Sequence, residues 1–324
     1  MSSQATELML EARCKVNLGL AVLARRGDGY HQIETIMARL ALADKLTLRL
    51  TNLTPGSVTL RTSVAPDLSH DLSHDLSHGT PTASSAGLPA DPNDNLVVRA
   101  ATAYAEAWTS ATGEPAPALE IELDKRVPIA AGLGGGSADA AATLRGLRLL
   151  LPVVADGQVT AAGEGVDAID IMALAASLGS DVPFFAADLP AALARGRGER
   201  LDPVVLPPAW LVLARPPLAV AAGDAYADLL GFTPRLKPQA LIEALAAGDD
   251  PRWKNALQPG VMKSWPQVRE LLGSLRDAGL RGCLMSGSGP TCFGVAADEE
   301  QAHAVSASLA AAEPGLWLAV TRLE

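Results

Sequence analysis

The segment 128–137, which reads Pro-Ile-Ala-Ala-Gly-Leu-Gly-Gly-Gly-Ser, constrains the fold more than any other part of the chain. It lies between a β-like run, residues 119–123, and a stretch whose apolar residues recur at helical spacing. Four glycines in five residues exceed what one tight turn needs, and they remove the Cβ atoms that would hold the backbone away from an anion. The following helix N-terminus adds unpaired N–H groups. The segment therefore predicts a phosphate-binding loop between a strand and a helix, with a turn needed only for packing as the alternative.

This loop belongs to neither of the two common nucleotide-binding patterns. No Gly-Lys-Ser/Thr is present, and Ser137 occupies the place of the last glycine in G-x-G-x-x-G. A second glycine cluster, Ser-Gly-Ser-Gly at residues 286–289, follows a short apolar run. Alone it is a weak signal, because it fits a simple turn. Together with the first loop, it could close around the same phosphates.

The length and composition predict two α+β domains. The chain has 324 residues, of which 48% are hydrophobic and 19% charged, so it can bury a large core. The first half reads as strands at 16–24, 33–42 and 45–50, then a helix capped by Asp94. The second half alternates strands at 209–214, 291–296 and 316–323 with helices at 237–247, 265–278 and 298–312. Because residues 152–165 resemble a linker, we expect domains at 1–165 and 166–324.

Residues 53–92 differ from the rest of the first half. They are rich in Ser, Pro, Gly and Asp, and they contain Asp-Leu-Ser-His three times in tandem. On a helix, His70, His74 and His78 would share one face and could bind a metal ion. Low-complexity segments seldom build sites, so the composition favours an expanded, exposed loop.

The charge and the cysteines limit the partners and the cellular compartment that we expect for this protein. The net charge of −10 and the pI near 5.0 argue against non-specific binding to nucleic acid or anionic membranes. Three cysteines without CxxC spacing fit a reducing compartment, and the N-terminus does not read as a signal peptide. We expect a cytoplasmic protein without membrane or nucleic-acid partners, as a monomer or weak homodimer.

Phosphoryl transfer to an alcohol benefits from a carboxylate that accepts the hydroxyl proton and from a nearby cation. Asp181, in Gly-Ser-Asp-Val-Pro-Phe-Phe, follows a helix end and precedes a proline, so it is a candidate base; a helix cap is its alternative role. Lys15 and Asn17 begin an aliphatic strand, and Tyr30 and His31 end the turn Gly-Asp-Gly-Tyr-His. Each of these is more often structural when it stands alone.

Taken together, the motifs resemble the galactokinase, homoserine kinase, mevalonate kinase and phosphomevalonate kinase (GHMP) superfamily. They run in the order Lys-x-Asn-Leu, Asp-Gly-Tyr-His, Asn-Leu-x-x-Arg-Ala, the glycine loop, Gly-x-Asp-Val-Pro-Phe-Phe, Gly-x-Gly-Glu and Ser-Gly-Ser-Gly. Within the superfamily, Asp-Gly-Tyr-His with Asp-Val-Pro-Phe-Phe is similar to the branch that phosphorylates 4-diphosphocytidyl-2-C-methyl-D-erythritol, a step of isoprenoid precursor synthesis. The resemblance covers the chain from about residue 12 onward, apart from 53–92.

The resemblance implies a two-domain fold, with a ribosomal-protein-S5-domain-2-like nucleotide domain followed by a ferredoxin-like α/β plait. It also implies ATP, Mg²⁺ and a small cytidine-diphosphate-linked acceptor in a cleft between the domains. By position, Asp181 becomes the general base and Lys15 the cation that stabilises the developing charge.

The remaining site residues are also carried over by position. The residues implied for ATP are Asn95, Lys125, Pro128, Ile129, Ala130, Ala131, Gly132, Leu133, Gly134, Gly135, Gly136, Ser137 and Ala138. The residues implied for the acceptor are Asn17, Tyr30, His31 and Tyr226, with the cytosine between the two tyrosines. Ser137 is also the implied contact for Mg²⁺ through the phosphates.

Three positions depart from the family pattern, and rival functions stay open. Ala138 stands where a second serine is common, Ala222 where threonine is common, and Ala256 follows Asn255 where an Asn-Asp pair is usual. Asp139, in the first turn after the loop, competes with Asp181 for the role of base. The rival functions are another GHMP kinase acting on homoserine, mevalonate or a sugar, a non-catalytic ATP-binding sensor, and a metal-binding or interaction protein built on the histidine repeat.

Overall fold

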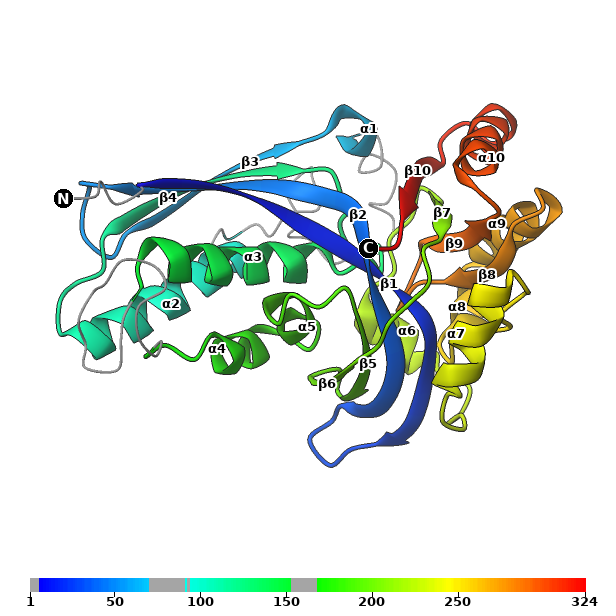
Figure 1. The fold of residues 1–324 in the computed structure, drawn as a ribbon, viewed down its shortest axis with the longest axis horizontal. Coiled ribbons are helices and arrows are strands. Elements are labelled where there is room, and N and C mark those ends of the chain that lie inside the picture. The colour runs from blue at the N-terminus through cyan, green and yellow to red at the C-terminus, as the bar shows by residue number, and fades with distance from the viewer. Residues whose placement is uncertain (1–5, 70–90, 92–93, 153–167) are drawn as a thin grey trace.

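Two β-sheets with flanking helices form the protein (Figure 1). The computed structural model describes residues 6–69, 91, 94–152 and 168–324. The strands are β1 (Glu7–Arg25), β2 (His31–Thr51), β3 (Val58–Val64), β4 (Ala118–Lys125), β5 (Ala191–Gly196), β6 (Arg200–Pro203), β7 (Trp210–Arg215), β8 (Arg281–Met285), β9 (Cys292–Ala296) and β10 (Trp317–Arg322). The helices are α1 (Pro66–Ser69), α2 (Leu96–Thr112), α3 (Gly135–Leu150), α4 (Ile171–Leu178), α5 (Val182–Ala186), α6 (Ala222–Ala227), α7 (Pro238–Ala247), α8 (Gln258–Ser264), α9 (Pro266–Asp277) and α10 (Glu299–Ala312).

The long strand β2 organises the first sheet. It pairs with β1 along one edge, and with β5 and β4 in succession along the other, giving the order β3-β4-β2-β5-β6. The sequence predicted two strands here, 33–42 and 45–50, with residues 43 and 44 between them. That prediction was wrong, since β2 continues through them. Asp44 is fully buried and accepts hydrogen bonds from the backbone N–H groups of Arg126 and Val127.

Helices α2 to α5 cover one face of the first sheet, as Figure 1 shows for α2, α3 and α4. The helix expected after residue 94 occurs as α2, and Val97, Ala100 and Tyr104 are among its buried residues. The cap lies one residue later than expected. The side chain of Asn95, rather than that of Asp94, accepts from the N–H of Val97 at 3.0 Å.

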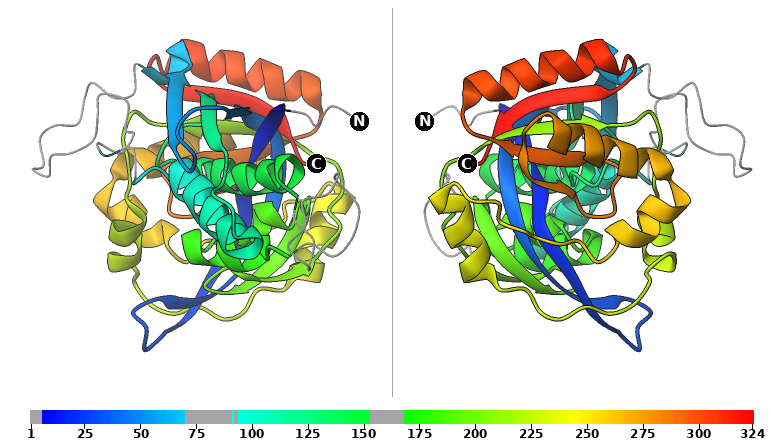
Figure 2. Two further views of the ribbon diagram at one scale, coloured as in Figure 1. Left: turned by 90° about the vertical axis from the view of Figure 1, so that its left-hand side faces the viewer. Right: turned by 90° about the vertical axis from the view of Figure 1, so that its right-hand side faces the viewer.

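The second sheet has the order β10-β7-β9-β8, and all its strand pairs are antiparallel. Renumbered from one, this is the order 4-1-3-2 of a ferredoxin-like α/β plait, which confirms the predicted fold of the second domain. Helices α9 and α10 pack against it, and Figure 2 shows α10 running along β10. The strands and helices expected at 209–323 all occur, with ends shifted by one or two residues.

Described parts of the insertion 53–92 form regular structure and contribute to the core, which corrects the prediction of an exposed loop throughout. Residues 58–64 form β3, which pairs in parallel with β4. Leu68, in the first copy of the repeat, is 3% exposed and belongs to the apolar core. His70, His74 and His78 lie outside the described residues.

Along the chain, the strands of the first sheet end with β6 and those of the second begin with β7. The sequence predicted the domain boundary earlier, at 165/166. Helices α4 and α5 pack into the core of the first sheet, and β5 and β6 are strands of that sheet. A stretch with Gly and Pro is typical of an interdomain linker, but it equally suits a connection within a domain.

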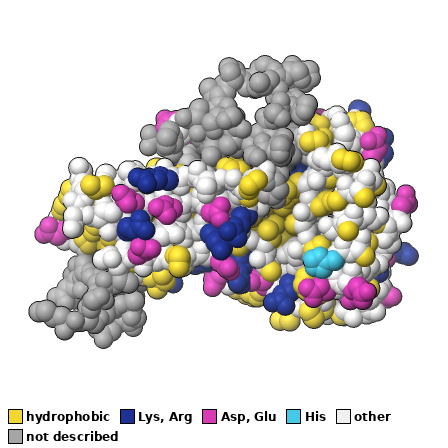
Figure 3. Space-filling view, turned by 90° about the horizontal axis from the view of Figure 1, so that it is seen from above, with side chains coloured by type: hydrophobic (Ala, Val, Ile, Leu, Met, Phe, Trp, Pro, Cys, Tyr) yellow, Lys and Arg dark blue, Asp and Glu magenta, His cyan; other side chains and the backbone are white. Residues whose placement is uncertain are grey.

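One apolar cluster joins the two sheets. It contains Cys14, Val16 and Ile36 from the first sheet together with Leu213 and Phe293 from the second. On the face shown in Figure 3, basic side chains lie beside acidic ones instead of gathering into a patch of one sign. In the described parts of the chain, no helix has the length and apolar character needed to span a bilayer.

Candidate active site

A cleft of about 920 Å³ and an adjoining pocket of about 310 Å³ meet at the first glycine loop. Gly132, Gly134 and Ser137 line both. The larger cleft also contains Ser288 of the second glycine cluster. A ligand in the pocket would therefore reach a ligand in the cleft across this loop.

Two glycines of the first loop lie where a side chain would meet close neighbours. At Gly132, where φ is +75°, a Cβ atom would lie 2.2 Å from the carbonyl oxygen of Ser286, and at Gly134 it would lie 3.1 Å from both Lys15 and Phe185. Helix α3 begins at Gly135, immediately after this approach. The first and second glycine loops thus pack against each other, and the α3 N-terminus opens into the pocket.

Lys15 and Asp181 meet beside this loop although 165 residues separate them in sequence. Lys15, on β1, is 3% exposed, and its Nζ lies 3.0 Å from the carbonyl oxygen of Gly132 and 3.5 Å from Asp181 Oδ2. Asp181 precedes α5, but its side chain makes no capping hydrogen bond. The carboxylate faces the cleft and the ammonium group instead, so the helix-cap alternative does not apply.

A second set of buried polar groups holds this arrangement together, and the sequence analysis did not single them out as site residues. Ser286 Oγ accepts from the N–H of Asn17 and donates to the carbonyl oxygen of Gly132 at 2.9 Å. Asn255 Nδ2 donates to the carbonyl oxygens of Met285 and Gly287. Two features of the sequence lay at these residues: the second glycine cluster, and Asn255 at the position where the family usually has an Asn-Asp pair. Neither one reveals that its side chain is buried against the other loop.

Asp139, the rival base, belongs to a different charge cluster. Its Oδ2 lies 2.7 Å from Lys125 Nζ, and Lys125 also pairs with Asp44. The pKa of Asp139 is raised to about 7, first by burial and then by the nearby carboxylate of Asp44. The ammonium group of Lys125 opposes this shift, but two carboxylates share it. Asp139 lines the smaller pocket and not the cleft that contains Lys15. Its position favours a role in holding α3.

The aromatic residues of the cleft make two close contacts. His31 stacks on Tyr226, with ring centroids 4.8 Å apart and an angle of 17° between the planes. Tyr30 is half exposed, and the guanidinium carbon of Arg197 lies 4.9 Å from its ring centroid. Burial raises the pKa of Tyr226 to about 12, so its hydroxyl remains a hydrogen-bond donor at neutral pH. All four side chains line the cleft.

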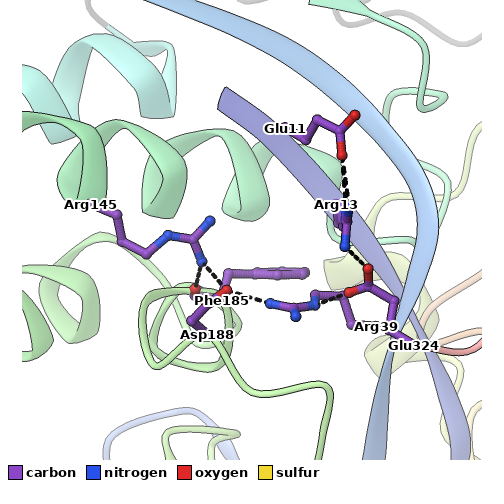
Figure 4. Close-up of polar contacts among 7 residues, drawn as sticks. All are labelled: Glu11, Arg13, Arg39, Arg145, Phe185, Asp188 and Glu324. Atoms are coloured by element: carbon purple, nitrogen blue, oxygen red, sulfur yellow. Dashed lines mark hydrogen bonds and ion pairs between the residues drawn. The ribbon is translucent and has the colours of Figure 1, made fainter. Parts of the chain in front are cut away.

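A chain of charges fixes the segment after α5, as Figure 4 shows. Asp188 has a left-handed backbone with φ +54°, and its carboxylate pairs with Arg39 of β2 and Arg145 of α3. Arg145 also donates to the carbonyl oxygen of Phe185 at 2.5 Å. Arg39 continues the chain to Glu324, which follows β10. The segment carrying Asp181 is thereby tied to both sheets.

The structure distributes the predicted residues over the two cavities. The expected residues that line the cleft but not the smaller pocket are Lys15, Asn17, Tyr30, His31, Asp181 and Tyr226. The expected residues that line the smaller pocket are Asn95, Lys125, Pro128, Ile129, Ala130, Ala131, Gly132, Gly134, Gly135, Gly136 and Ser137. Leu133 and Ala138 line neither. Both are buried, and the N–H of Ala138 donates within the helix to Gly134, so it is not available to a phosphate.

Known proteins match both halves of the chain. The family model for the GHMP kinases N terminal domain matches residues 95–192, across the boundary expected at 165, and that for the GHMP kinases C terminal matches residues 239–315. The 4-diphosphocytidyl-2-C-methyl-D-erythritol kinase of Deinococcus radiodurans is 42% identical over 316 residues, which cover 96% of this chain and 92% of that one. The corresponding protein of Thermus thermophilus is 37% identical over 302 residues, covering 93% and 92%.

Solved structures agree with these relatives. A crystal structure of 4-(cytidine 5'-diphospho)-2C-methyl-D-erythritol kinase matches with a TM-score of 0.73 and 35% identity, covering 97% of this chain and 99% of that one. Homoserine kinase from Cytophaga hutchinsonii matches with a TM-score of 0.63 at 18% identity, covering 100% and 96%, and this likeness concerns the fold alone.

Proposed function

The chain belongs to the GHMP kinases and, within them, to the 4-diphosphocytidyl-2-C-methyl-D-erythritol kinase family, and we propose on this premise how its two cavities divide the reaction. The enzyme transfers the γ-phosphoryl group of ATP to the 2-hydroxyl of 4-diphosphocytidyl-2-C-methyl-D-erythritol, giving the 2-phosphate and ADP. This step belongs to the non-mevalonate pathway of isoprenoid precursors. ATP occupies the smaller pocket, and the acceptor occupies the cleft.

One observation carries the proposal: Lys15 and Asp181 lie 3.5 Å apart beside the glycine loop where the two cavities meet. The acceptor hydroxyl placed there can give its proton to Asp181 while its oxygen attacks the γ-phosphorus. The bond from that phosphorus to the ADP oxygen breaks as the new one forms. Lys15 stabilises the negative charge that develops on the oxygens, which matters because a tertiary hydroxyl is weakly acidic.

The residues present fit a Mg²⁺ ion that arrives on the nucleotide. Within the described ranges, no group of three or more His, Cys, Asp or Glu side chains is placed to hold a metal ion by itself. Ser137, in the first turn of α3 and on the wall of both cavities, offers a hydroxyl ligand beside the phosphates. When bound, the ion supplies charge neutralisation at the β- and γ-phosphates.

We assign this activity to the cytoplasm and to a single chain, either as a monomer or as a weak homodimer. The glycine loop, Lys15 and Asp181 lie together within one chain. The chain has three cysteines, and all are free thiols: Cys14, Cys283 and Cys292. Free thiols suit a compartment that supplies ATP and keeps thiols reduced.

A coupled assay of ADP release across a panel of alcohols tests the function. We expect turnover with the cytidine-diphosphate-linked acceptor, and no turnover with homoserine, mevalonate or galactose at the same concentrations. Phosphorus NMR of the product should place the new phosphate on the 2-oxygen. Clear turnover of another alcohol, with none of the expected acceptor, would assign the enzyme to a different branch of the superfamily.

The Asp181→Asn variant tests the proposed base. The amide cannot accept the proton, so we expect kcat to fall by about 10²–10⁴-fold. The affinity for ATP, measured by calorimetry, should stay within about twofold, because the nucleotide lies in the other pocket. An unchanged kcat would move the role to another group or to a mechanism without a base.

A further inference from the structure

Arg197 lies in the tight turn 196–199 between β5 and β6, directly against the loop that carries Asp181. A Cβ atom at Gly198 would lie 3.2 Å from the carbonyl oxygen of Ser180 and 3.8 Å from Asp181 Oδ1. The N–H of Arg197 donates to Glu199 Oε2 at 2.6 Å, and both Gly196 and Gly198 have positive φ angles, +79° and +127°. The backbone of Arg197 is therefore held close to the catalytic carboxylate.

The guanidinium group of Arg197 lines the cleft without an anionic partner. Its neighbours are paired: Arg195 binds Glu34 and Asp202, and Arg26 binds Asp28. For Arg197, no ion pair to any described carboxylate occurs, and its side chain contacts the face of Tyr30 instead. A cation held over an aromatic ring in a cleft, without an ion pair to a described carboxylate, can bind an anionic ligand.

The position of Arg197 matches one part of the proposed acceptor, so the inference rests on the proposed function. That acceptor is linear, with a base, a ribose, a diphosphate and a branched tetrol in that order. The reacting hydroxyl belongs at Asp181 and Lys15, and the base belongs among the aromatic residues Tyr30, His31 and Tyr226. Arg197 spans the interval, because its backbone abuts the Asp181 loop and its guanidinium reaches Tyr30. The diphosphate must lie in this interval.

We propose that the guanidinium of Arg197 binds the diphosphate of the acceptor and thereby selects for nucleoside-diphosphate-linked alcohols. Its planar fork can donate two parallel hydrogen bonds to phosphate oxygens, a geometry that an ammonium group does not offer. Because the contact exists both before and during phosphoryl transfer, it affects acceptor binding more than the chemical step. Small alcohols without a diphosphate gain nothing from it.

The test compares cytidine 5′-diphosphate with cytidine as competitive inhibitors against the acceptor, at saturating ATP. In Arg197→Gln, we expect the inhibition constant of cytidine diphosphate and the KM of the acceptor to rise by about 10- to 100-fold. The inhibition constant of cytidine, kcat and the KM of ATP should each stay within about twofold. The Arg197→Lys variant keeps the positive charge but lacks the planar guanidinium. Its inhibition constant for cytidine diphosphate and its KM for the acceptor should fall between those of wild type and Arg197→Gln. Arg200→Gln, an exposed arginine on β6, is the matched control and should behave as wild type.

The possible outcomes separate this inference from the proposed function. Equal weakening of cytidine and cytidine diphosphate would show that Arg197 only supports Tyr30, and unchanged values would show that it does not bind the ligand. Weaker binding of cytidine diphosphate in Arg25→Gln, and not in Arg197→Gln, would assign the diphosphate to Arg25, which is exposed and also lines the cleft. Each of these overturns the inference while wild-type turnover upholds the function. Absence of wild-type turnover with the acceptor overturns both.

Discussion

At the scale of single residues, the pairs Lys15–Asp181 and Lys125–Asp139 have different roles. The pair Lys15–Asp181 faces the cleft, where Asp181 is partly exposed and can meet a substrate. The pair Lys125–Asp139 is buried on both sides, and it connects the end of β4 to the first turn of α3. Oδ1 of Asp139 receives no hydrogen bond from any described residue. A proton on this oxygen would neutralise the cluster formed by Asp44, Lys125 and Asp139.

The pH dependence of stability tests this view of Asp139. Its pKa is raised from the ordinary value of 3.8 to about 7 in the folded protein, mainly by burial, so the folded state keeps a proton that the unfolded state loses. Stability linked to this group is therefore present at low pH and declines as pH rises from about 4 to 7, by up to about 1.4 kcal/mol per pH unit. Urea unfolding of wild type and Asp139→Asn between pH 5 and 8 should show the variant gaining relative to wild type as pH rises. Parallel curves would contradict the shift.

At the scale of elements, the strand–loop–helix unit β4–α3 depends on contact with the second glycine loop. Gly132→Ala would place a methyl group 2.2 Å from a backbone oxygen in a left-handed conformation. We expect a loss of about 2–4 kcal/mol in the free energy of unfolding, since neither backbone can yield easily. Thermal unfolding measures the change.

Gly136→Ala is the matched control for Gly132→Ala. It lies in the same loop–helix unit, but its Cβ would meet only Leu96, at 3.8 Å. Its stability should be unchanged or higher by up to about 1 kcal/mol, because alanine favours helix. Equal destabilisation by both substitutions would mean that the contact between the loops does not explain the glycine at 132.

At the scale of the whole molecule, the apolar cluster that joins the two sheets predicts that they unfold together. Phe293 is fully buried in this cluster and packs edge-on against Trp253, with ring centroids 5.8 Å apart. Phe293→Ala should lower the free energy of unfolding by about 3–5 kcal/mol in a single transition. Far-UV circular dichroism and tryptophan fluorescence should report the same midpoint. Phe232→Ala, at a residue that is 58% exposed, should change stability by less than about 0.5 kcal/mol.

Two separate transitions in Phe293→Ala, one at the wild-type midpoint, would contradict this prediction. They would mean that each sheet is stable without the other. The ion-pair chain from Arg145 through Asp188 and Arg39 to Glu324 also crosses between the sheets (Figure 4). Because Asp188 is exposed, we expect that chain to orient the segment after α5 more than to stabilise the fold.

The sequence by itself determined the features that depend on local backbone chemistry. Consecutive glycines before an amphipathic stretch predicted a turn between a strand and a helix, and the structure has this turn directly before α3. The alternation of strands and helices from residue 209 onward predicted the second sheet, because hydrophobic periodicity records which faces are buried. The motif order was sufficient to indicate the family and the candidate pair Lys15 and Asp181.

Only the tertiary structure decided which polar residues meet. Asp44 lies between the two strands that the sequence predicted, yet β2 continues through it, since its partners are Lys125, Arg126 and Val127, about 80 residues away in sequence. The placement of Asp181 and Asp139 in different cavities, the contact of Arg197 with the ring of Tyr30 and the membership of β5 and β6 in the first sheet likewise depend on contacts between distant segments. A residue type shows what a side chain can bind, whereas the packing of remote strands and loops determines which partner is present.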